Sequence, residues 1–251
     1  MSILVKDEAD VIEDNIRYHS RVGVDCFVVM DNDSTDGTRE ILQRLSNEFD
    51  LHIIDQPDNK FQQSEWVTEM ATYCKNTLKA DLEINNDADE FWQPDNGVSL
   101  KSYLSIKDSV VTVKRYNTLL PQEARNENFD YCNSNTIIIN GFKSGPKSKK
   151  TIETMLLNYP SPKTIINPHG LKEVKTGNHR ASHINRIFNG RIENNIKIIH
   201  FPIRSYSQFK KRFKNRSHIS QLNFYGLSDK TNYLNDKKTE ENIECICSVL
   251  T

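Results

Sequence analysis

The sequence predicts an α/β protein, in which helices cover the faces of a mostly parallel sheet. Short apolar runs alternate with helical patterns over the first half of the chain, and this alternation is typical of such a sheet. The 251 residues suffice for one large core, because a domain of this size buries roughly three quarters of its unfolded surface. Hydrophobic residues make up 36%, too many for a disordered chain, and the formal net charge of -1 points to neither nucleic acid nor membrane.

The first half of the chain supplies the alternation. Apolar runs predict strands at residues 2–5, 26–30, 51–54 and 82–85, and helical patterns separate them at residues 9–22, 38–47 and 64–79. In the first helix, Ile12, Ile16 and His19 share one face, and Asp7 is placed to cap its start. Each strand should therefore begin at the same edge of the sheet.

The second half is less regular. Strands are expected at residues 110–113, 136–139, 164–166 and 196–201, with a turn-rich basic loop at 143–150. We expect a single domain over residues 1–227. Within it, residues 1–95 would form the nucleotide-binding half and residues 96–227 the acceptor half, followed by a polar tail at 228–251.

Cysteine spacing and hydropathy favour a cytoplasmic protein. The five cysteines include no C-x-x-C pair, so a structural zinc site is not expected and reduced thiols are the default. No apolar run approaches the ~20 residues needed to cross a bilayer. The apolar opening at residues 1–5 meets acidic residues at once, unlike a signal peptide. The further expectation is a peripheral contact on the inner face of the membrane.

The main charge feature is a basic segment that runs from Lys210 to Arg216. Its simpler interpretation is a solvated helix face. Its functional interpretation is attraction to phosphate, either on a donor or on a lipid-linked acceptor at an anionic membrane surface. Phe209 and Phe213 are interleaved with the charges, but no nucleic-acid-binding motif surrounds them, so nucleic acid is not an expected partner.

Polar clusters follow three of the predicted strands at their carboxyl ends, where parallel sheets bind ligands. They are Lys6-Asp7-Glu8, the run at 31–38 and Asp87-Ala88-Asp89-Glu90. Because helices alternate with these strands, the three ends should converge on one rim. In the last cluster, one carboxylate can accept from ribose hydroxyls while the other binds a hard divalent cation that it shares with substrate phosphates.

Each cluster also has a structural interpretation. Asp87-Ala88-Asp89 suits a solvated acidic turn, although an aromatic pair, Phe91-Trp92, follows it and could wall a pocket. Lys6-Asp7-Glu8 suits the acidic first turn of a helix. Asp36-Gly37-Thr38 suits a tight turn with a helix cap. Capping does not account for Asp31-Asn32-Asp33, whose clustered groups need donors such as a nucleobase edge or a ribose.

Taken together, these motifs resemble family 2 glycosyltransferases, most closely the branch similar to family 92. The resemblance rests on Val5-Lys6-Asp7-Glu8-Ala9-Asp10, on the run at 31–38 and on Asn86-Asp87-Ala88-Asp89-Glu90-Phe91, and it covers the first 95 residues well. It implies the GT-A fold, a Rossmann-like mixed sheet flanked by helices. It also implies that Glu8 and residues 31–33 contact the donor base, Asp87 the ribose and Asp89 a cation. The nucleotide-sugar-binding residues are then Val5, Lys6, Glu8, Asp31, Asn32, Asp33, Asp87 and Ala88.

Three positions depart from the family pattern. Asp7 replaces the usual Asn, Asn32 stands where a second Asp is common, and Asp33 stands where Gly is frequent. Asn32 still offers an acceptor for a uracil imide, so a UDP-sugar remains the favoured donor.

Later segments extend the resemblance at residues 163–169 and 198–209. GT-A enzymes often complete the metal shell with a late histidine, which makes His179 and His200 candidate ligands beside Asp89, for Mn²⁺ or Mg²⁺. Each histidine also suits a purely structural, hydrogen-bonded role.

The predicted catalytic residues are Asp89 and a carboxylate base. Inversion at the anomeric carbon is what the resemblance implies, and it requires a base within about 2.6–3.2 Å of the acceptor hydroxyl. Glu123, Asp130 and Glu173 lie in the second half, none in a recognisable motif, and a surface charge is the favoured interpretation of each. Glu173 is the one that we select.

The sequence therefore predicts a metal-dependent, hexosyltransferase-like enzyme that moves a sugar from a nucleotide-sugar donor to a glycan or lipid-linked acceptor. The setting that the resemblance suggests is surface-polysaccharide biosynthesis. One alternative is a sugar nucleotidyltransferase, which needs a glycine-rich basic loop where Lys6-Asp7-Glu8 stands. Another is a non-catalytic module that binds nucleotides or carbohydrates.

Overall fold

The structure is a computed structural model, and it describes residues 1–57, 62–95, 97–119, 131, 137–138, 159–174, 180–184, 190–205 and 208. The chain divides into two compact units. Unit 1 comprises Met1–Arg115 and Ser161–Ile199, and unit 2 comprises Tyr116–Pro160 and His200–Thr251. The division of the chain into a nucleotide-binding half and an acceptor half stays a prediction.

The parallel part of the sheet lies in unit 1 and is built by the first half of the chain. Its strands are β1 (Ser2–Val5), β2 (Phe27–Asp31), β3 (Leu51–Asp55) and β4 (Glu83–Asn86), in the order β3-β2-β1-β4. The helices between them are α1 (Ile12–Arg21), α2 (Thr38–Leu45) and α3 (Gln63–Asn76). All pairings among the four strands are parallel, as the alternating pattern predicts.

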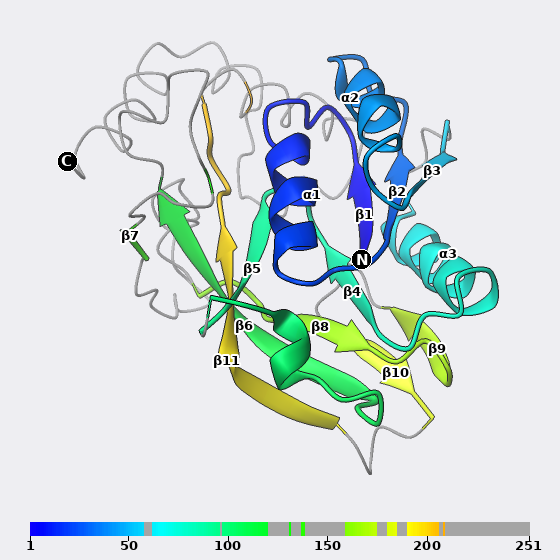
Figure 1. Ribbon diagram of the computed structural model, residues 1–251, viewed down its shortest axis with the longest axis vertical. Coiled ribbons are helices and arrows are strands. Elements are labelled where there is room, and N and C mark those ends of the chain that lie inside the picture. The colour runs from blue at the N-terminus through cyan, green and yellow to red at the C-terminus, as the bar shows by residue number, and fades with distance from the viewer. Residues whose placement is uncertain are drawn as a thin grey trace, which may run out of the picture. The chain divides into compact units, whose positions relative to one another are not determined.

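The helices divide between the two faces of this sheet (Figure 1). The first two crossovers step from β1 outward to β3, and the third returns from β3 to β4. Since such crossovers are right-handed, α1 and α2 cover one face and α3 covers the other. The face under α3 is apolar: Val28 and Met30 pack against Trp66, Val67 and Met70.

The other part of the sheet makes it mixed. The sheet continues from β4 in the order β8-β6-β11-β5, and β8 pairs antiparallel with both β4 and β6. Their bounds are β5 (Glu90–Pro94), β6 (Val110–Leu119), β8 (Lys163–Ile166) and β11 (Gly190–His200). A short 3-10 helix, η1 (Leu100–Tyr103), precedes β6, and β9 (Leu171–Val174) pairs with β10 (Ala181–His183) as a separate two-stranded sheet.

In unit 2, the end of β6 pairs with β7 (Ile137–Ile138). His200 Nδ1 lies 2.7 Å from the Asn117 side-chain oxygen, and Tyr131 meets Phe201 edge to face. Among the residues that the structure describes, no helix is both long and apolar enough to span a membrane. The predicted basic segment from Lys210 to Arg216 lies outside the described residues, as do the loop at 143–150 and the tail at 228–251.

Two sequence predictions were wrong in local detail. The first helix begins at Ile12, and the residue before it makes no side-chain cap. Asp7 does not cap this helix, because its carboxylate accepts from the backbone N–H of Thr35 at 2.8 Å instead. Phe91 and Trp92 do not wall a pocket: they lie on β5, which was not predicted as a strand, and are 1% and 0% exposed.

Candidate functional site

The loops that follow β1 and β2 are bound to each other at the carboxyl edge of the sheet. Lys6 Nζ donates to the carbonyl oxygens of Asn32 at 2.6 Å and Asp33 at 3.0 Å. The backbone N–H of Asp7 donates to Ser34 Oγ at 2.9 Å, beside the Asp7–Thr35 contact. The backbone of Asp7 and of Asp33 adopts positive φ, 57° and 55°, so both loops turn sharply. The predicted base-contacting residues therefore form one continuous loop surface.

Some polar side chains of these loops make hydrogen bonds within the loops, and others are exposed or half-buried. Asp31 is 5% exposed, and its carboxylate accepts from the backbone N–H of Ser34 at 3.1 Å. Asp36 accepts from the backbone N–H and the hydroxyl of Thr38, at 3.1 and 2.6 Å, whereas the N-cap residue of α2 is Gly37, which makes no side-chain cap. Asp33 is exposed, and Asn32 and Glu8 are half-buried. The latter three are therefore the side chains that a ligand at this edge can reach.

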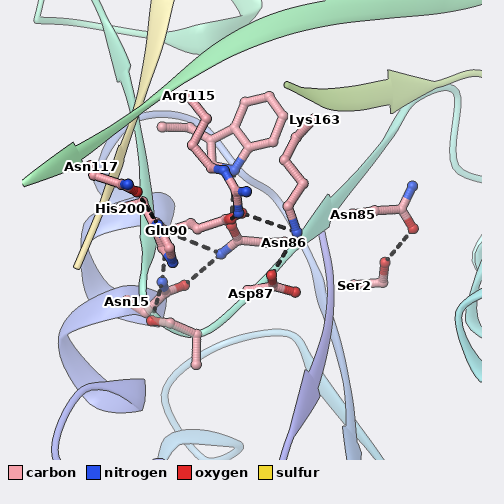
Figure 2. Close-up of polar contacts among 12 residues, drawn as sticks. Ser2, Asn15, Asn85, Asn86, Asp87, Glu90, Arg115, Asn117, Lys163 and His200 are labelled. Atoms are coloured by element: carbon pink, nitrogen blue, oxygen red, sulfur yellow. Dashed lines mark hydrogen bonds and ion pairs between the residues drawn. The ribbon is translucent and has the colours of Figure 1, made fainter. Parts of the chain in front are cut away.

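The acidic turn that follows β4 is fixed through its main chain by a buried amide network. Asn15 of α1 donates to the carbonyl oxygens of Ala88 at 2.8 Å and Glu90 at 2.9 Å. Asn86 in turn donates to the Asn15 side-chain oxygen at 3.1 Å and accepts from the Trp92 indole at 2.8 Å. Figure 2 shows Asn15 and Asn86 directed toward this turn. Every amide has more than one partner here, so the turn has little freedom to move.

His19 completes this network as a neutral ring. Burial lowers the pKa of His19 to about 3. Its Nδ1 lies 2.8 Å from the Asn15 carbonyl oxygen, and its Nε2 accepts from the backbone N–H of Trp92 at 3.1 Å. Nδ1 therefore carries the proton, and His19 links α1 to β5 without adding charge near the acidic turn.

Two cations lie against the side chains of the same turn. Lys163 of β8 is fully buried, with Nζ 2.7 Å from Asp87 Oδ2 and 3.3 Å from Glu90 Oε2. Arg115 of β6 approaches Glu90 Oε1 at 2.5 Å. With Asp89 included, three carboxylates face two cations, so the cluster carries a formal charge of -1. The Lys163, Asp87, Glu90 and Arg115 side chains are seen together in Figure 2.

The charges in this cluster set the ionisation of Asp87. Burial alone would raise the pKa of the Asp87 carboxyl, and the neighbouring Asp89 carboxylate acts in the same direction. The charge and hydrogen bond of Lys163, together with the charge of Arg115, outweigh both, so the pKa of Asp87 lies below its ordinary value and the group is ionised at neutral pH. Asp89 is 1% exposed. Two carboxylates thus lie close together, with one of them held by a buried lysine.

The two loops and the acidic turn share one edge of the sheet. β1 lies between β2 and β4, with Val5 paired to Asp31 and Ile3 to Asn86. Because these strands are parallel, their carboxyl ends are neighbours, as the sequence predicts. Val5 is fully buried and Ala88 is 3% exposed, so both shape this edge through the backbone.

The remaining predicted residues lie elsewhere or beyond the described chain. Glu173 is half-buried on β9, in the separate two-stranded sheet that packs on α3. His200 ends β11, with its Nδ1 2.7 Å from the Asn117 side-chain oxygen. His179, Glu123 and Asp130 lie outside the described residues. A base role for Glu173 and a metal role for His179 or His200 stay predictions.

Three residues of this cluster were not predicted as site residues: Arg115, Lys163 and Glu90. A signal for Lys163 was present, because a lysine within the apolar strand Lys163-Thr164-Ile165-Ile166 needs a buried anionic partner. Arg115 follows an apolar run at 110–113 in the same way. The partner in each case lies tens of residues away, so the pairing becomes evident only in the fold.

The fold and the site define a class of protein, an α/β protein with an acidic turn at the carboxyl edge of its parallel strands. The comparison with protein families places it further. The chain belongs to glycosyltransferase family 92, whose family model matches residues 1–247. It is therefore a glycosyltransferase, and the mixed sheet flanked by helices is the GT-A type that the resemblance implies.

Solved structures of other glycosyltransferases are similar only remotely. S. aureus TarS 1-349 in complex with UDP is 14% identical, with a TM-score of 0.47 over 98% of this chain and 69% of that chain. The longer S. aureus TarS is 13% identical, with a TM-score of 0.47 over 98% of this chain and 41% of that one. The mannosyltransferase PcManGT from Pyrobaculum calidifontis, solved with GDP-Man and Mn2+, is 17% identical. Its TM-score is 0.35 over 50% of this chain and 36% of that one. Comparison with curated proteins gives no match.

Proposed function

We propose that this glycosyltransferase takes its sugar from a nucleotide-sugar donor, with a UDP-sugar favoured, at the carboxyl edge of β1, β2 and β4. The observation that carries the proposal is the Asp87–Glu90 turn: it is fixed by buried amides and keeps one more carboxylate than its two cations neutralise. Polar groups at this edge of an open α/β sheet are where such folds bind nucleotides.

The carboxylate oxygens of the turn are suitable ligands for a hard divalent cation. Asp87 and Asp89 offer carboxylate oxygens, the ligands that Mn²⁺ and Mg²⁺ prefer. The Asp89 carboxylate acts to raise the pKa of Asp87, and a cation between the two groups would relieve this repulsion. When bound, the cation would neutralise charge on the donor diphosphate and on the departing nucleoside diphosphate. His200 and His179 are the further ligands that we propose.

The β1 and β2 loops supply the groups for the nucleoside. Glu8, Asn32 and Asp33 are reachable at this edge, and their carboxylate and amide oxygens can accept from a base N–H or a ribose hydroxyl. Lys6 also holds the two loops together, because its ammonium donates hydrogen bonds to two backbone carbonyl oxygens. In this proposal, Lys6 acts by positioning the loop and the acidic groups act by contact.

The acceptor side of the proposal rests on the sequence. We propose a glycan or lipid-linked acceptor in surface-polysaccharide biosynthesis, inversion at the anomeric carbon, and Glu173 as the base that takes the proton of the acceptor hydroxyl. The basic segment from Lys210 to Arg216 would hold the protein against an anionic membrane surface through its charges.

A donor screen tests the proposal. The protein is incubated with a panel of nucleotide sugars, Mn²⁺ and oligosaccharide acceptors, and released nucleoside diphosphate is measured. Calorimetry with UDP in the presence and absence of Mn²⁺ then measures binding at the same site. We expect UDP to bind more tightly with Mn²⁺ in the wild type, and Asp89→Asn to lose that difference.

A matched substitution separates the site from general effects of charge. Asp81 is an exposed aspartate near the start of β4, so Asp81→Asn removes the same charge outside the turn. It should bind UDP and Mn²⁺ as the wild type does. Mn²⁺-dependent UDP binding that survives in Asp89→Asn would contradict the proposed metal role, and binding with no turnover of any donor would favour a non-catalytic module.

A further inference from the structure

Three side chains of different chemistry meet at the opposite edge of the sheet. Cys26 immediately precedes β2, Asp50 immediately precedes β3, and His52 is the second residue of β3. The Cys26 Sγ, a carboxylate oxygen of Asp50 and a ring nitrogen of His52 all lie within 4.8 Å of one another. Since β2 and β3 are parallel, this is their amino edge, whereas the acidic turn lies at the carboxyl edge. The group is therefore separate from the donor site.

Strand pairing fixes how the three side chains meet. Val28 pairs with His52, and the backbone N–H of Phe27 donates to the Asp50 carbonyl oxygen at 2.8 Å. Side chains alternate along a strand, so Cys26 and Val28 share a face of the sheet, as do Asp50 and His52. Val28 belongs to the face that α3 covers. The three ligand atoms are thus brought together by the register of two rigid strands.

The His52 ring is held from both sides. Its Nδ1 lies 3.1 Å from the hydroxyl of Tyr73 on α3, and its Nε2 lies 3.1 Å from Asp50 Oδ1. A partner on the far nitrogen of a ligating histidine fixes the ring orientation and the tautomer. The side chains of His52 and Asp50 are 34% and 64% exposed, so an ion can reach them from solvent.

We propose that Cys26, Asp50 and His52 bind one borderline-soft divalent cation, of the type of Zn²⁺. Thiolate, imidazole and carboxylate are the three ligand types of protein zinc sites, and three protein ligands leave a fourth position for water. The thiol separates this site in its chemistry from the hard-oxygen site at the other edge, because Mg²⁺ and Mn²⁺ prefer carboxylate and water.

A bound cation would change the balance of charges around Cys26. Burial raises the pKa of the Cys26 thiol to about 11, and the Asp50 carboxylate acts in the same direction, against the opposing Met1 ammonium. A bound cation would reverse the influence of Asp50 and release the Cys26 proton. With the cation on Nε2, the Nδ1 of His52 would donate to the Tyr73 oxygen, which lies 3.1 Å away. Binding therefore releases one proton and should tighten as pH rises.

An exposed ion pair is the simpler explanation of part of this group. His52 and Asp50 can pair at 3.1 Å without a metal, but exposed pairs of this kind contribute about 0–1 kcal/mol. Without a metal, the neutral Cys26 thiol can donate to the Asp50 carboxylate, and its Sγ lies 3.9 Å from the Phe27 carbonyl oxygen. A bound cation would instead use all three groups as ligands.

The test uses the full chain, treated with a chelator and then titrated with ZnCl₂ and, separately, CoCl₂. We expect one Zn²⁺ bound per chain at this site, and with Co²⁺ the near-ultraviolet absorption of a thiolate ligand. Cys26→Ser should abolish that absorption. Tyr73→Phe, which removes only the hydroxyl behind His52, should weaken Zn²⁺ binding by about 10–100-fold.

Matched variants make the result decisive. His169→Gln removes an exposed histidine outside the group and should leave the absorption and the affinity unchanged. His52→Gln and Asp50→Asn test the other two ligands, and Asp50 is exposed enough that its variant should fold even if Cys26→Ser does not. Circular dichroism confirms folding in each case. Co²⁺ binding without thiolate absorption, or Zn²⁺ affinity that is unchanged in both His52→Gln and Asp50→Asn, would overturn the proposal.

Discussion

Glu83→Gln should make this protein more stable at pH 8 and leave its stability nearly unchanged at pH 4.5. Glu83 is the first residue of β4 and is 0% exposed. Ser2 and Cys74 lie beside it, yet among the described residues neither carboxylate oxygen has a hydrogen-bond partner of good geometry. Burial of this carboxyl raises its pKa to about 7, from an ordinary 4.5.

The size of the effect follows from that difference in pKa. The folded-state pKa exceeds the unfolded one by about 2.5 pH units, and each unit corresponds to about 1.36 kcal/mol. Because the folded state holds the Glu83 proton more tightly, the contribution of Glu83 to the free energy of unfolding is highest below pH 4.5. It falls as the pH rises from 4.5 through 7, by about 3 kcal/mol in all. Glutamine cannot ionise, so Glu83→Gln removes this loss.

Urea unfolding at several pH values between 4.5 and 8 measures the effect as a difference between the variant and the wild type. Other groups titrate in both proteins, and their contributions cancel in this difference. Glu40→Gln is the matched control, because Glu40 is exposed on α2 and should show no difference that depends on pH. A Glu83→Gln advantage that is the same at pH 4.5 and pH 8, or a variant less stable than the wild type at pH 8, would refute the reasoning.

Three further predictions concern the acidic turn. Asp89→Ala should lower transfer about a hundredfold or more, by analogy with the loss of about 2.7–4 kcal/mol of electrostatic stabilisation, as measured by nucleoside diphosphate release. Lys163→Met leaves the buried Glu90 and the half-buried Asp87 without that lysine and should lower the free energy of unfolding by about 3–5 kcal/mol in urea titration. His19→Gln should remove a loss of stability that develops as the pH falls from 6.5 through about 3, because the folded ring has the lower pKa; unfolding at pH 7 and pH 4 compares the two proteins.

Local sequence pattern predicted much of the first half of the fold. The strands and helices up to Asn86 were predicted within a few residues, because each combines an apolar run or an inward face with turn residues at its ends. The neighbouring positions of the β1, β2 and β4 carboxyl ends followed from the same alternation. Both depend on interactions within short segments and on the handedness of crossovers.

The remainder depends on contacts between distant segments, which the local pattern does not contain. β5 follows β4 after three residues, Asp87 to Asp89, and its apolar residues looked like a pocket wall because no turn signal separates them from the acidic run. Asp7 was predicted to cap the first helix, but its carboxylate instead accepts a hydrogen bond from the backbone N–H of Thr35 in the next loop. The Cys26–Asp50–His52 group has no C-x-x-C spacing, because the register between β2 and β3 brings it together.

The acidic turn is held by two networks that do different work. Neutral groups, Asn15 and Asn86, bind its main chain, whereas Lys163 and Arg115 bind its carboxylates. A buried ion pair adds little net stability, because desolvation offsets most of the attraction. The charged network is therefore better explained by its effect on the Asp87 side chain than by a gain in stability. Lys163 keeps the Asp87 carboxylate ionised and oriented, while the amides keep the main chain of the turn in place. On this view, losing an amide should displace all the carboxylates of the turn together, and losing Lys163 should change the orientation and ionisation of Asp87 first.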